Sequence, residues 1–590
     1  MGMARRAAGL PRLLLSAALI GALVAGCARP KPEPEPPNPW RDLRSVDAWV
    51  QHLTLEEKVG QLLWFGLKDT SVGYETEQLI KEGKAGGFIF FARQGSSPAT
   101  LKALTDQLLI LNQLRERPTP GLVISVDHEG GTVQRWGAPF TPWPGNMAIG
   151  ATGSVDYARR VGEAMAQEVK AAGINMNLSP VADVNNNPAN PVIGVRSFGE
   201  DPQMVSKLVT AYIQGAQGQQ VSAVAKHFPG HGDTSLDSHK ALPTVNQPME
   251  RLEKVELVPF KAAIAADVDA IMSAHIIFPA IAKDELPATL SSDVLTGLLK
   301  GKLGFKGLVV SDAMDTMKAI TDKWGAEQGI VMAVQAGADA VLITESFGLQ
   351  AAYHGILVKA VQDGRISQDR LNDAVRRNLE LKAKRGLLPM AGAKLSVAPI
   401  DTSVVGSEAH RNLALQVGSD ALTLVRNQHL PLKLTPDQLV LAVGPSYSAA
   451  VPNPGEIATA LGAGLKAVHP AVKELTLDRS PSAAGAAAVR AAARDAAVIV
   501  YAVTNSQKYP DHQQLIKELM ATGKPVIVVG MGEPYDLTAL PGVQTYVAAY
   551  GFQTSNLQGV GALLLGKASP KGKLPVSIPG LYPAGHGLTY

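Results

Sequence analysis

The chain has 590 residues, a formal net charge of +3 and a single cysteine. Because 55 lysines and arginines are balanced by 52 aspartates and glutamates, with no basic block in the body of the chain, no nucleic-acid partner is expected. One cysteine excludes a disulfide framework and any cysteine-based metal site. A hydrophobic fraction of 46% indicates a folded globular protein, and the length fits two large domains as well as about four of ordinary size.

The N-terminal segment has the residue order of an export signal. Arg5 and Arg6, with Arg12 further on, precede an apolar stretch over 13–26, an order typical of a secretory signal. The stretch is short for a membrane span. Small residues directly before Cys27 make the segment resemble a bacterial lipoprotein signal, and a plain signal peptide with an incidental cysteine is the alternative.

The lipoprotein resemblance implies a lipid-anchored protein. It makes residues 1–26 a removed signal peptide, Cys27 the lipidated first residue and residues 27–40 a tether. The proline-rich run over 31–39 favours an extended spacer of roughly 30 Å, because proline fixes φ and removes backbone donors. We therefore expect a membrane partner at the bacterial cell envelope, either the periplasmic side of the outer membrane or the outer face of the cytoplasmic membrane.

Residues 41–390 repeat one theme, in which a short apolar run is followed by a polar loop and a helical segment. The eight runs lie at 61–67, 86–92, 121–127, 174–184, 222–228, 269–278, 307–312 and 338–344. Apolar strands that alternate with amphipathic helices predict a parallel sheet covered by helices, and eight repeats suffice to close a (β/α)₈ barrel. Periodicity alone leaves an open doubly wound sheet as the alternative. Thr54 with Glu57, and Ser97, are expected to cap helices.

A second domain is predicted after the barrel. Residues 391–415 are irregular and are expected to be a linker. Residues 416–590 again alternate strands with alanine-rich helices, which predicts an α/β sandwich. Its strands are expected at 421–427, 439–444, 496–503, 525–532 and 543–550. A stabilising domain without chemistry of its own is the simpler interpretation of this part.

Polar clusters follow four of the predicted barrel strands, where the loops of such a barrel carry its chemistry. The clusters lie at 127–135, 194–199, 226–239 and 311–312. Each also has an ordinary explanation. Asp312 could be the N-cap of the next helix, and Lys226 and Arg196 could pair with surface carboxylates.

The cluster at 226–239 admits three interpretations. His227 and His231 are four apart, as in a helical zinc site, but Pro229 and Gly230 between them exclude that helix. Neither a phosphate-loop nor a dinucleotide motif is present. A glycine-rich loop carrying Asp237 and His239 remains, in which the carboxylate can accept the imidazole N–H and prepare it for acid/base work.

A second group of polar residues offers acceptors and fork-shaped donors suited to several hydroxyl groups. This group comprises Asp127, Arg135, Arg196, Lys226 and His227. The chemistry indicated is therefore on a polar, uncharged substrate such as a sugar.

These motifs together resemble family 3 glycoside hydrolases, and specifically their β-N-acetylglucosaminidase branch. The segments DHEGGTVQR, GVRSFGED, KHFPGHGDTSLDSH and SDAM match the blocks of that family in order and spacing, and the Asp-Ser-His ending is the mark of the branch. The tail over 561–579 and 585–590 looks like the family's second domain, so the resemblance covers roughly residues 45 to 590. Thr132 departs from the arginine usual there, which we expect to be a local change because Arg135 is retained.

The resemblance implies roles for individual residues. Asp312 corresponds to the nucleophile, His239 to the general acid/base and Asp237 to its partner, and the second group of polar residues grips the terminal sugar. It implies a retaining exo-β-N-acetylglucosaminidase, a β-N-acetylhexosaminidase that hydrolyses terminal GlcNAc from peptidoglycan-derived or related glycans through a glycosyl-aspartate intermediate. No metal or organic cofactor is expected.

Three alternatives stay open. Another family 3 specificity, β-glucosidase or β-xylosidase, often takes its acid/base from the second domain, against which the Asp-Ser-His ending argues. Transfer of the sugar to phosphate is the second, because a histidine tolerates an approaching anion better than a carboxylate does. The third is a non-catalytic, lipid-anchored glycan-binding module.

Overall fold

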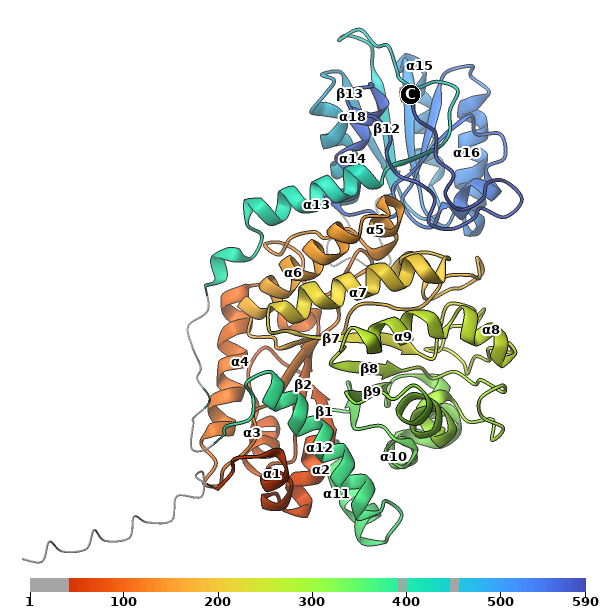
Figure 1. Cartoon of the computed structure of the whole chain (residues 1–590). Helices are drawn as coiled ribbons and strands as arrows, with labels where there is room; N and C mark the ends of the chain where they lie inside the picture. Colours follow the sequence, from red (N-terminus) through yellow and green to blue (C-terminus); the bar gives the residue numbers. More distant parts are fainter. Residues whose placement is uncertain (1–41, 391–394, 396–400, 446–455) are drawn as a thin grey trace, which may run out of the picture. The chain divides into compact units, whose positions relative to one another are not determined.

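Figure 1 shows the computed structural model of the chain, which describes residues 42–390, 395, 401–445 and 456–590. These residues belong to one compact unit. The predicted signal peptide, the tether and Cys27 lie outside the described residues. Among the helices that are described, none has both the length and the apolarity needed to cross a bilayer.

Eight parallel strands close into a barrel, so the (β/α)₈ prediction is confirmed and the open-sheet alternative is wrong. Each strand lies in one of the eight apolar runs or overlaps it. In spatial order they are β1 (Leu63–Gly66), β10 (Ala340–Ile343), β9 (Leu308–Ala313), β8 (Ala270–Ser273), β7 (Ser222–Phe228), β6 (Met176–Asn177), β3 (Val123–Val126) and β2 (Gly87–Phe90).

Alternate side chains of each strand point to opposite faces, and both faces are buried. Trp64 and Met272 belong to the apolar cluster inside the barrel, whereas Phe65 and Ile271 belong to the larger cluster that the helices cover. Double burial explains the near-continuous apolar runs in the sequence.

The surrounding helices begin where the capping residues predict. Thr54 and Glu57 form a capping box at α2, and the Ser97 hydroxyl accepts the Thr100 N–H at α4. The helices of this part are α1 (Val46–His52), α2 (Leu55–Leu62), α3 (Tyr74–Lys81), α4 (Pro98–Gln113), α5 (Asn146–Thr152), α6 (Val155–Ala171), α7 (Pro202–Gly218), α8 (Met249–Lys254), α9 (Leu257–Ala265), α10 (Lys318–Ala336), α11 (Gln350–Gln362) and α12 (Gln368–Lys384), with a π-helix at Asp293–Lys302.

The C-terminal part is a six-stranded sheet with helices on both faces, as predicted for an α/β sandwich. The order is β11 (Thr423–Arg426), β16 (Thr545–Ala548), β15 (Val526–Gly530), β14 (Val498–Val503), β12 (Val440–Pro445) and β13 (Val472–Leu477), and only β11 runs antiparallel to its neighbour. Its helices are α14 (Glu456–Lys466), α15 (Ala483–Asp495), α16 (Pro510–Met520), α17 (Thr554–Leu557) and α18 (Val560–Leu564).

Two sequence predictions for this part need correction. Strand β13 was not predicted, because it is a half-exposed edge strand without a continuous apolar run. The linker predicted over 391–415 is wrong from residue 408 onward, where α13 (Glu408–Ala421) begins with Ser407 as N-cap. The apolar side of α13 buries Leu413 and Val417 against α5 and α17, and this packing stabilises the helix.

A buried carboxylate links the barrel to the start of α13. Glu168 on α6 accepts hydrogen bonds from Thr141 N (3.0 Å) and Oγ1 (2.5 Å), Gly406 N (3.1 Å) and His410 Nδ1 (2.9 Å). Burial by itself would raise the pKa of Glu168, but these donors lower it below its usual value. The ionised group therefore fits its buried position.

Candidate active site

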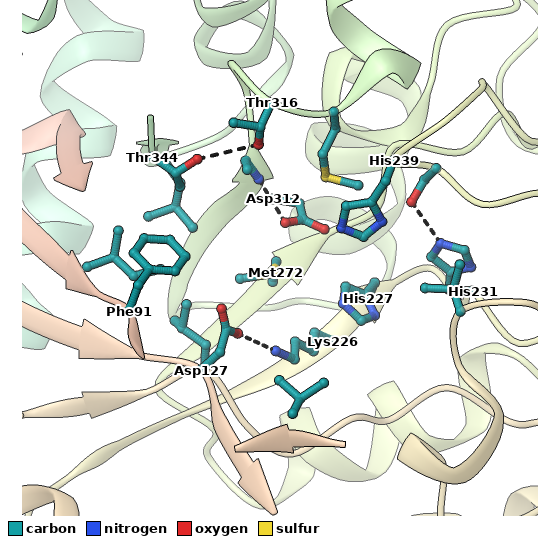
Figure 2. Close-up of a pocket in the computed structure, with 18 of the residues that line it drawn as sticks. Phe91, Asp127, Lys226, His227, His231, His239, Met272, Asp312, Thr316 and Thr344 are labelled. Carbon is teal, nitrogen blue, oxygen red and sulfur yellow. Dashed lines mark hydrogen bonds and ion pairs between the residues drawn. The ribbon is translucent and has the colours of Figure 1, made fainter. Parts of the chain in front are cut away.

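A cavity of about 360 Å³ opens at the carboxyl ends of the barrel strands (Figure 2). This lies near the small end of ligand-pocket sizes. Seven of the eight predicted catalytic and sugar-binding residues line it: Asp127, Arg135, Arg196, Lys226, His227, His239 and Asp312. The eighth, Asp237, holds His239 from outside the lining.

Asp312 is the next-to-last residue of strand β9 and lines the cavity. Its Oδ1 accepts the Ala313 backbone N–H at 2.8 Å, and its carboxylate faces the imidazole of His239 in Figure 2. Burial would raise the pKa of Asp312, but the nearby imidazoles and the Ala313 N–H lower it below its ordinary value. The N-cap alternative for this residue is wrong, because α10 begins later, with Met317 at the cap position.

His239 is oriented by Asp237. Its Nδ1 lies 2.8 Å from Asp237 Oδ1, and its backbone N–H donates to the same oxygen at 2.9 Å. An ionised carboxylate only accepts hydrogen bonds, so Nδ1 carries the proton and Nε2 is left for a substrate. Burial would raise the pKa of Asp237, whereas the hydrogen bonds from His239 lower it.

The loop that carries His239 is fastened at two points. The His239 and Ser238 carbonyls accept the first N–H groups of α10, from Lys318 (3.4 Å) and Ala319 (3.3 Å). The Ser238 hydroxyl lies 3.1 Å from His231 Nε2. Burial lowers the pKa of His231 to about 4, so its ring is uncharged at neutral pH and holds Ser238 by a hydrogen bond.

A chain of buried charges forms another wall of the cavity. Lys226 Nζ lies 2.7 Å from both Asp127 Oδ1 and Glu129 Oε1, and Asp127 Oδ2 accepts Arg135 Nη2 at 3.0 Å. Arg196 grips Glu129 with two bonds, from Nε to Oε2 (3.0 Å) and from Nη2 to Oε1 (2.8 Å). The interpretation of Lys226 and Arg196 as partners of surface carboxylates is wrong. Their partner Asp127 lines the cavity, and their partner Glu129 is buried.

These ion pairs keep the carboxylates and the cations of the wall ionised although they are buried. Burial opposes ionisation of Asp127, yet Lys226 and Arg135 hold its pKa well below the usual range. Burial likewise opposes the charge on Arg196, and Glu129 raises the pKa of its guanidinium. The wall therefore presents fixed, charged donors and acceptors, which form stronger hydrogen bonds to hydroxyls than neutral groups do.

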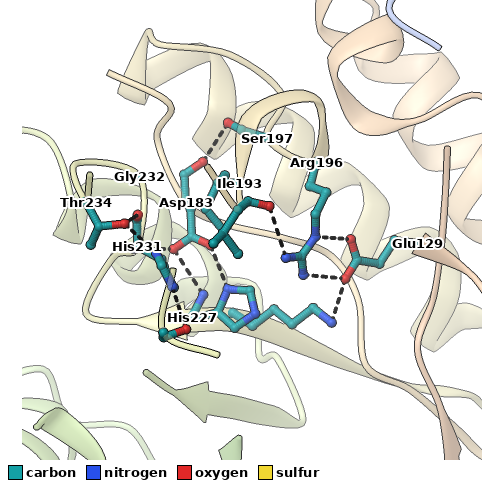
Figure 3. Close-up of polar contacts among 12 residues, drawn as sticks. Glu129, Asp183, Ile193, Arg196, Ser197, His227, His231, Gly232 and Thr234 are labelled. Atoms are coloured by element: carbon teal, nitrogen blue, oxygen red, sulfur yellow. Dashed lines mark hydrogen bonds and ion pairs between the residues drawn. The ribbon is translucent and has the colours of Figure 1, made fainter. Parts of the chain in front are cut away.

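His227 is held by a buried aspartate (Figure 3). The Asp183 carboxylate accepts a hydrogen bond from His227 Nδ1 at 2.8 Å. It also accepts the backbone N–H groups of His227 and His231, at 3.1 and 2.6 Å. The Nε2 of His227 is thereby available to the cavity. Among the residues that the structure describes, no three His, Cys, Asp or Glu side chains are placed to hold a metal ion.

Two supporting carboxylates were missed from the sequence. Glu129 lies inside the segment 127–135 and Asp183 near the end of the run 174–184, so both stand at strand ends where polar residues carry weight. Their partners are 44 to 97 residues away along the chain, and no local pattern reveals such pairs.

Comparison with known proteins decides the family. Residues 54–381 match the Glycosyl hydrolase family 3 N terminal domain, and residues 381–589 match the Glycosyl hydrolase family 3 C-terminal domain. The chain belongs to glycosyl hydrolase family 3. The family resemblance seen in the sequence motifs is thereby confirmed.

Two similar proteins carry names that refer to related activities. Beta-hexosaminidase A of Pseudoalteromonas piscicida is 35% identical over 387 residues, which are 62% of this chain, and the match spans 63% of that protein's length. A protein of Cellulomonas fimi named Beta-N-acetylglucosaminidase/beta-glucosidase is 30% identical over 572 residues, covering 90% of this chain and 95% of the relative.

A solved structure shares the two-domain fold of this family 3 chain. The family 3 β-N-acetylglucosaminidase of Paenibacillus sp. str. FPU-7 aligns with a TM-score of 0.82 and 38% identity, over 89% of this chain and 98% of that one. The similarity therefore includes the sandwich as well as the barrel.

Proposed function

We propose that this family 3 chain is a retaining exo-β-N-acetylglucosaminidase. The observation that carries the proposal is that Asp312 and His239 line the same cavity side by side, and that this cavity is also lined by a group of fixed, charged hydroxyl-binding side chains. A carboxylate nucleophile and a proton donor on the two sides of a glycosidic bond are what a retaining glycosidase requires.

In the first step, Asp312 attacks the anomeric carbon while His239 donates its Nε2 proton to the leaving oxygen. The covalent glycosyl-aspartate forms and the leaving group departs as an alcohol. In the second step, the now neutral imidazole takes a proton from water, whose oxygen displaces Asp312. Asp237 stabilises the imidazolium present before each proton donation and keeps its ring in position.

The charged wall binds the terminal sugar. Lys226, Arg135 and Arg196 supply donors to hydroxyl oxygens, and Asp127 supplies an acceptor to hydroxyl hydrogens. These four groups, with His227, line a cavity of only about 360 Å³, a size that favours binding of a single terminal sugar over a longer stretch of glycan. This supports an exo mode of attack.

Specificity for the N-acetyl sugar is supported by the names of the relatives and by the Asp-Ser-His loop. The Pseudoalteromonas and Paenibacillus proteins are named as a hexosaminidase and an N-acetylglucosaminidase, and the Cellulomonas protein is named for both β-N-acetylglucosaminidase and β-glucosidase. In this chain the acid/base candidate comes from the barrel loop itself, at His239, and lines the same cavity as Asp312.

We further propose that the enzyme is lipid-anchored through Cys27 at the cell envelope and acts on peptidoglycan-derived glycans. The signal-like segment and the proline-rich tether of the sequence support this location. Radiolabelled palmitate incorporated into the wild type and not into Cys27→Ala would support the anchor. Equal labelling of the two proteins contradicts it.

The activity is tested with aryl β-N-acetylglucosaminide and aryl β-glucoside side by side, for wild type, Asp312→Ala and His239→Ala. We expect a strong preference for the N-acetyl sugar and loss of activity in both variants. Glucoside activity that survives His239→Ala would place the proton donor elsewhere. The assay is repeated in phosphate buffer, where free sugar as the product indicates hydrolysis and sugar 1-phosphate indicates phosphorolysis. A wild type without any activity would favour the non-catalytic glycan-binding module.

A further inference from the structure

The loop that carries Arg196 is held from outside the barrel. It spans 185–200 and includes Gly194 and Gly199, the two glycines of the segment GVRSFGED. Both have positive φ, +43° and +155°, and both face residues of the C-terminal sandwich.

The first contact is at Gly194. Glu533 Oε1 accepts the Val195 backbone N–H at 3.3 Å, directly before Arg196. A Cβ added at Gly194 would lie 1.8 Å from that oxygen. A glycine is therefore required for the Glu533 carboxylate to reach the loop backbone.

The second contact is at Gly199 and Glu200. A Cβ at Gly199 would lie 2.6 Å from the Pro575 carbonyl, which accepts the Glu200 N–H at 3.0 Å. The Glu200 carboxylate in turn accepts the Ser577 backbone N–H (2.8 Å) and hydroxyl (2.6 Å). A third contact joins Asn185 Nδ2 to the Tyr535 hydroxyl at 3.2 Å.

The same loop holds the sugar-binding side chains in place. Arg196 reaches Glu129, and Glu129 also holds Lys226. The Ser197 hydroxyl donates to the Asp183 carbonyl at 2.7 Å, and the Asp183 carboxylate orients His227 (Figure 3). A displacement of the loop therefore moves three groups of the cavity wall together.

We propose that the C-terminal sandwich positions the sugar-binding wall of the barrel, and that Glu533 and Ser577 are the positioning residues. They touch no part of the cavity and act through the Arg196 loop. The glycines of GVRSFGED then serve domain docking, in addition to the turn that presents Arg196. The inference rests on the proposed function only in that Arg196 binds the sugar.

The test is steady-state kinetics on aryl β-N-acetylglucosaminide with the full chain. Glu533→Ala removes the first contact, and Ser577→Ala removes one of the two hydrogen bonds from Ser577 to Glu200. We expect Glu533→Ala to raise KM roughly tenfold, because a displaced Arg196 would lose about one hydrogen bond to the bound sugar, and Ser577→Ala to raise KM by a smaller factor; kcat should stay within about twofold in both. Glu533→Gln retains an acceptor oxygen and should restore KM. Glu518→Ala on α16 also removes a half-buried glutamate, one that pairs with Arg490 and does not contact the loop; it is the matched control and should leave both constants unchanged.

A double-mutant cycle shows whether the effect travels through Arg196. In an Arg196→Ala background, Glu533→Ala should raise KM by a smaller factor than it does in the wild type, because the part of the effect that passes through Arg196 is already lost. Additive increases, an unchanged KM in Glu533→Ala, or a fall in kcat alone would overturn the inference, because a merely structural role lowers the active fraction without changing KM. A wild type without activity would instead reject the proposed function.

Discussion

Asp237 Oδ1 accepts two hydrogen bonds from His239, one from the ring Nδ1 at 2.8 Å and one from the backbone N–H at 2.9 Å. The His239 side chain is otherwise 59% exposed, so this one oxygen fixes the ring. The orientation of His239, the proposed acid/base, therefore depends on a residue that does not itself line the cavity.

Asp237→Asn is expected to lower kcat by about 10²–10³ on substrates with poor leaving groups, because an amide stabilises the imidazolium poorly and permits the wrong tautomer. Substrates with a dinitrophenyl leaving group need little protonation and should lose much less. Comparing the two substrate classes measures the effect. Equal losses on both would contradict an acid/base partnership.

Asp312→Ala is expected to reduce kcat at least about a thousandfold, since no covalent intermediate can form. Added azide should restore turnover by attacking from the vacated face, giving a glycosyl azide of α configuration. Product analysis by NMR identifies the anomer. A β-azide, or rescue of His239→Ala alone to the α-azide, would reverse the assigned roles.

The acid limb of kcat/KM should lie at unusually low pH. Asp312 must be ionised to attack, and although burial opposes its charge, its surroundings lower its pKa below the ordinary aspartate value. Activity should therefore persist as pH falls through the usual carboxyl range and disappear only below it. A pH profile of the wild type checks this, and an acid limb above the ordinary range contradicts it.

Lys226→Met should be strongly destabilising. Lys226 is 2% exposed and neutralises Asp127 and Glu129, so its loss leaves buried carboxylates with one cation each. A reduction of about 3–5 kcal/mol in the free energy of unfolding is expected. Urea unfolding measures it, with Lys254→Met on the exposed helix α8 as control. A change below about 1 kcal/mol would contradict the prediction, because it would mean that Arg135 and Arg196 alone suffice to neutralise Asp127 and Glu129.

Asp536 in the sandwich should make stability depend on pH. Burial raises its pKa to about 7. Among the described residues, the Ser506 N–H donates to its Oδ1, and its Oδ2 has no hydrogen-bond partner. The folded state holds this proton up to a higher pH than the unfolded state does. The resulting contribution to the free energy of unfolding is therefore complete below the ordinary carboxyl range, and it is lost as pH rises to about 7. Asp536→Asn should remove a slope of up to about 1.4 kcal/mol per pH unit in the free energy of unfolding between pH 4 and 7. Exposed Asp495→Asn should not.

The barrel was predictable from the sequence because its strands are buried on both faces and appear as uninterrupted apolar runs. Edge strand β13 contains charged and polar residues among its apolar ones, so it forms no uninterrupted apolar run and was missed. The residues that line the cavity were visible as polar groups at strand ends. Glu129 and Asp183 were not singled out, since their importance comes from burial and from partners distant in sequence.

The hydrogen bonds around Glu168 bear on how this enzyme can be divided. Two of its four donors, from Gly406 and His410, belong to the stretch leading into the sandwich. A barrel expressed alone, ending at residue 390, would keep only the two Thr141 donors to this carboxylate. The pKa of Glu168 should rise in such a fragment because two hydrogen bonds to its charged form are lost, and Glu168→Gln is the first substitution to try if the barrel is to be studied by itself.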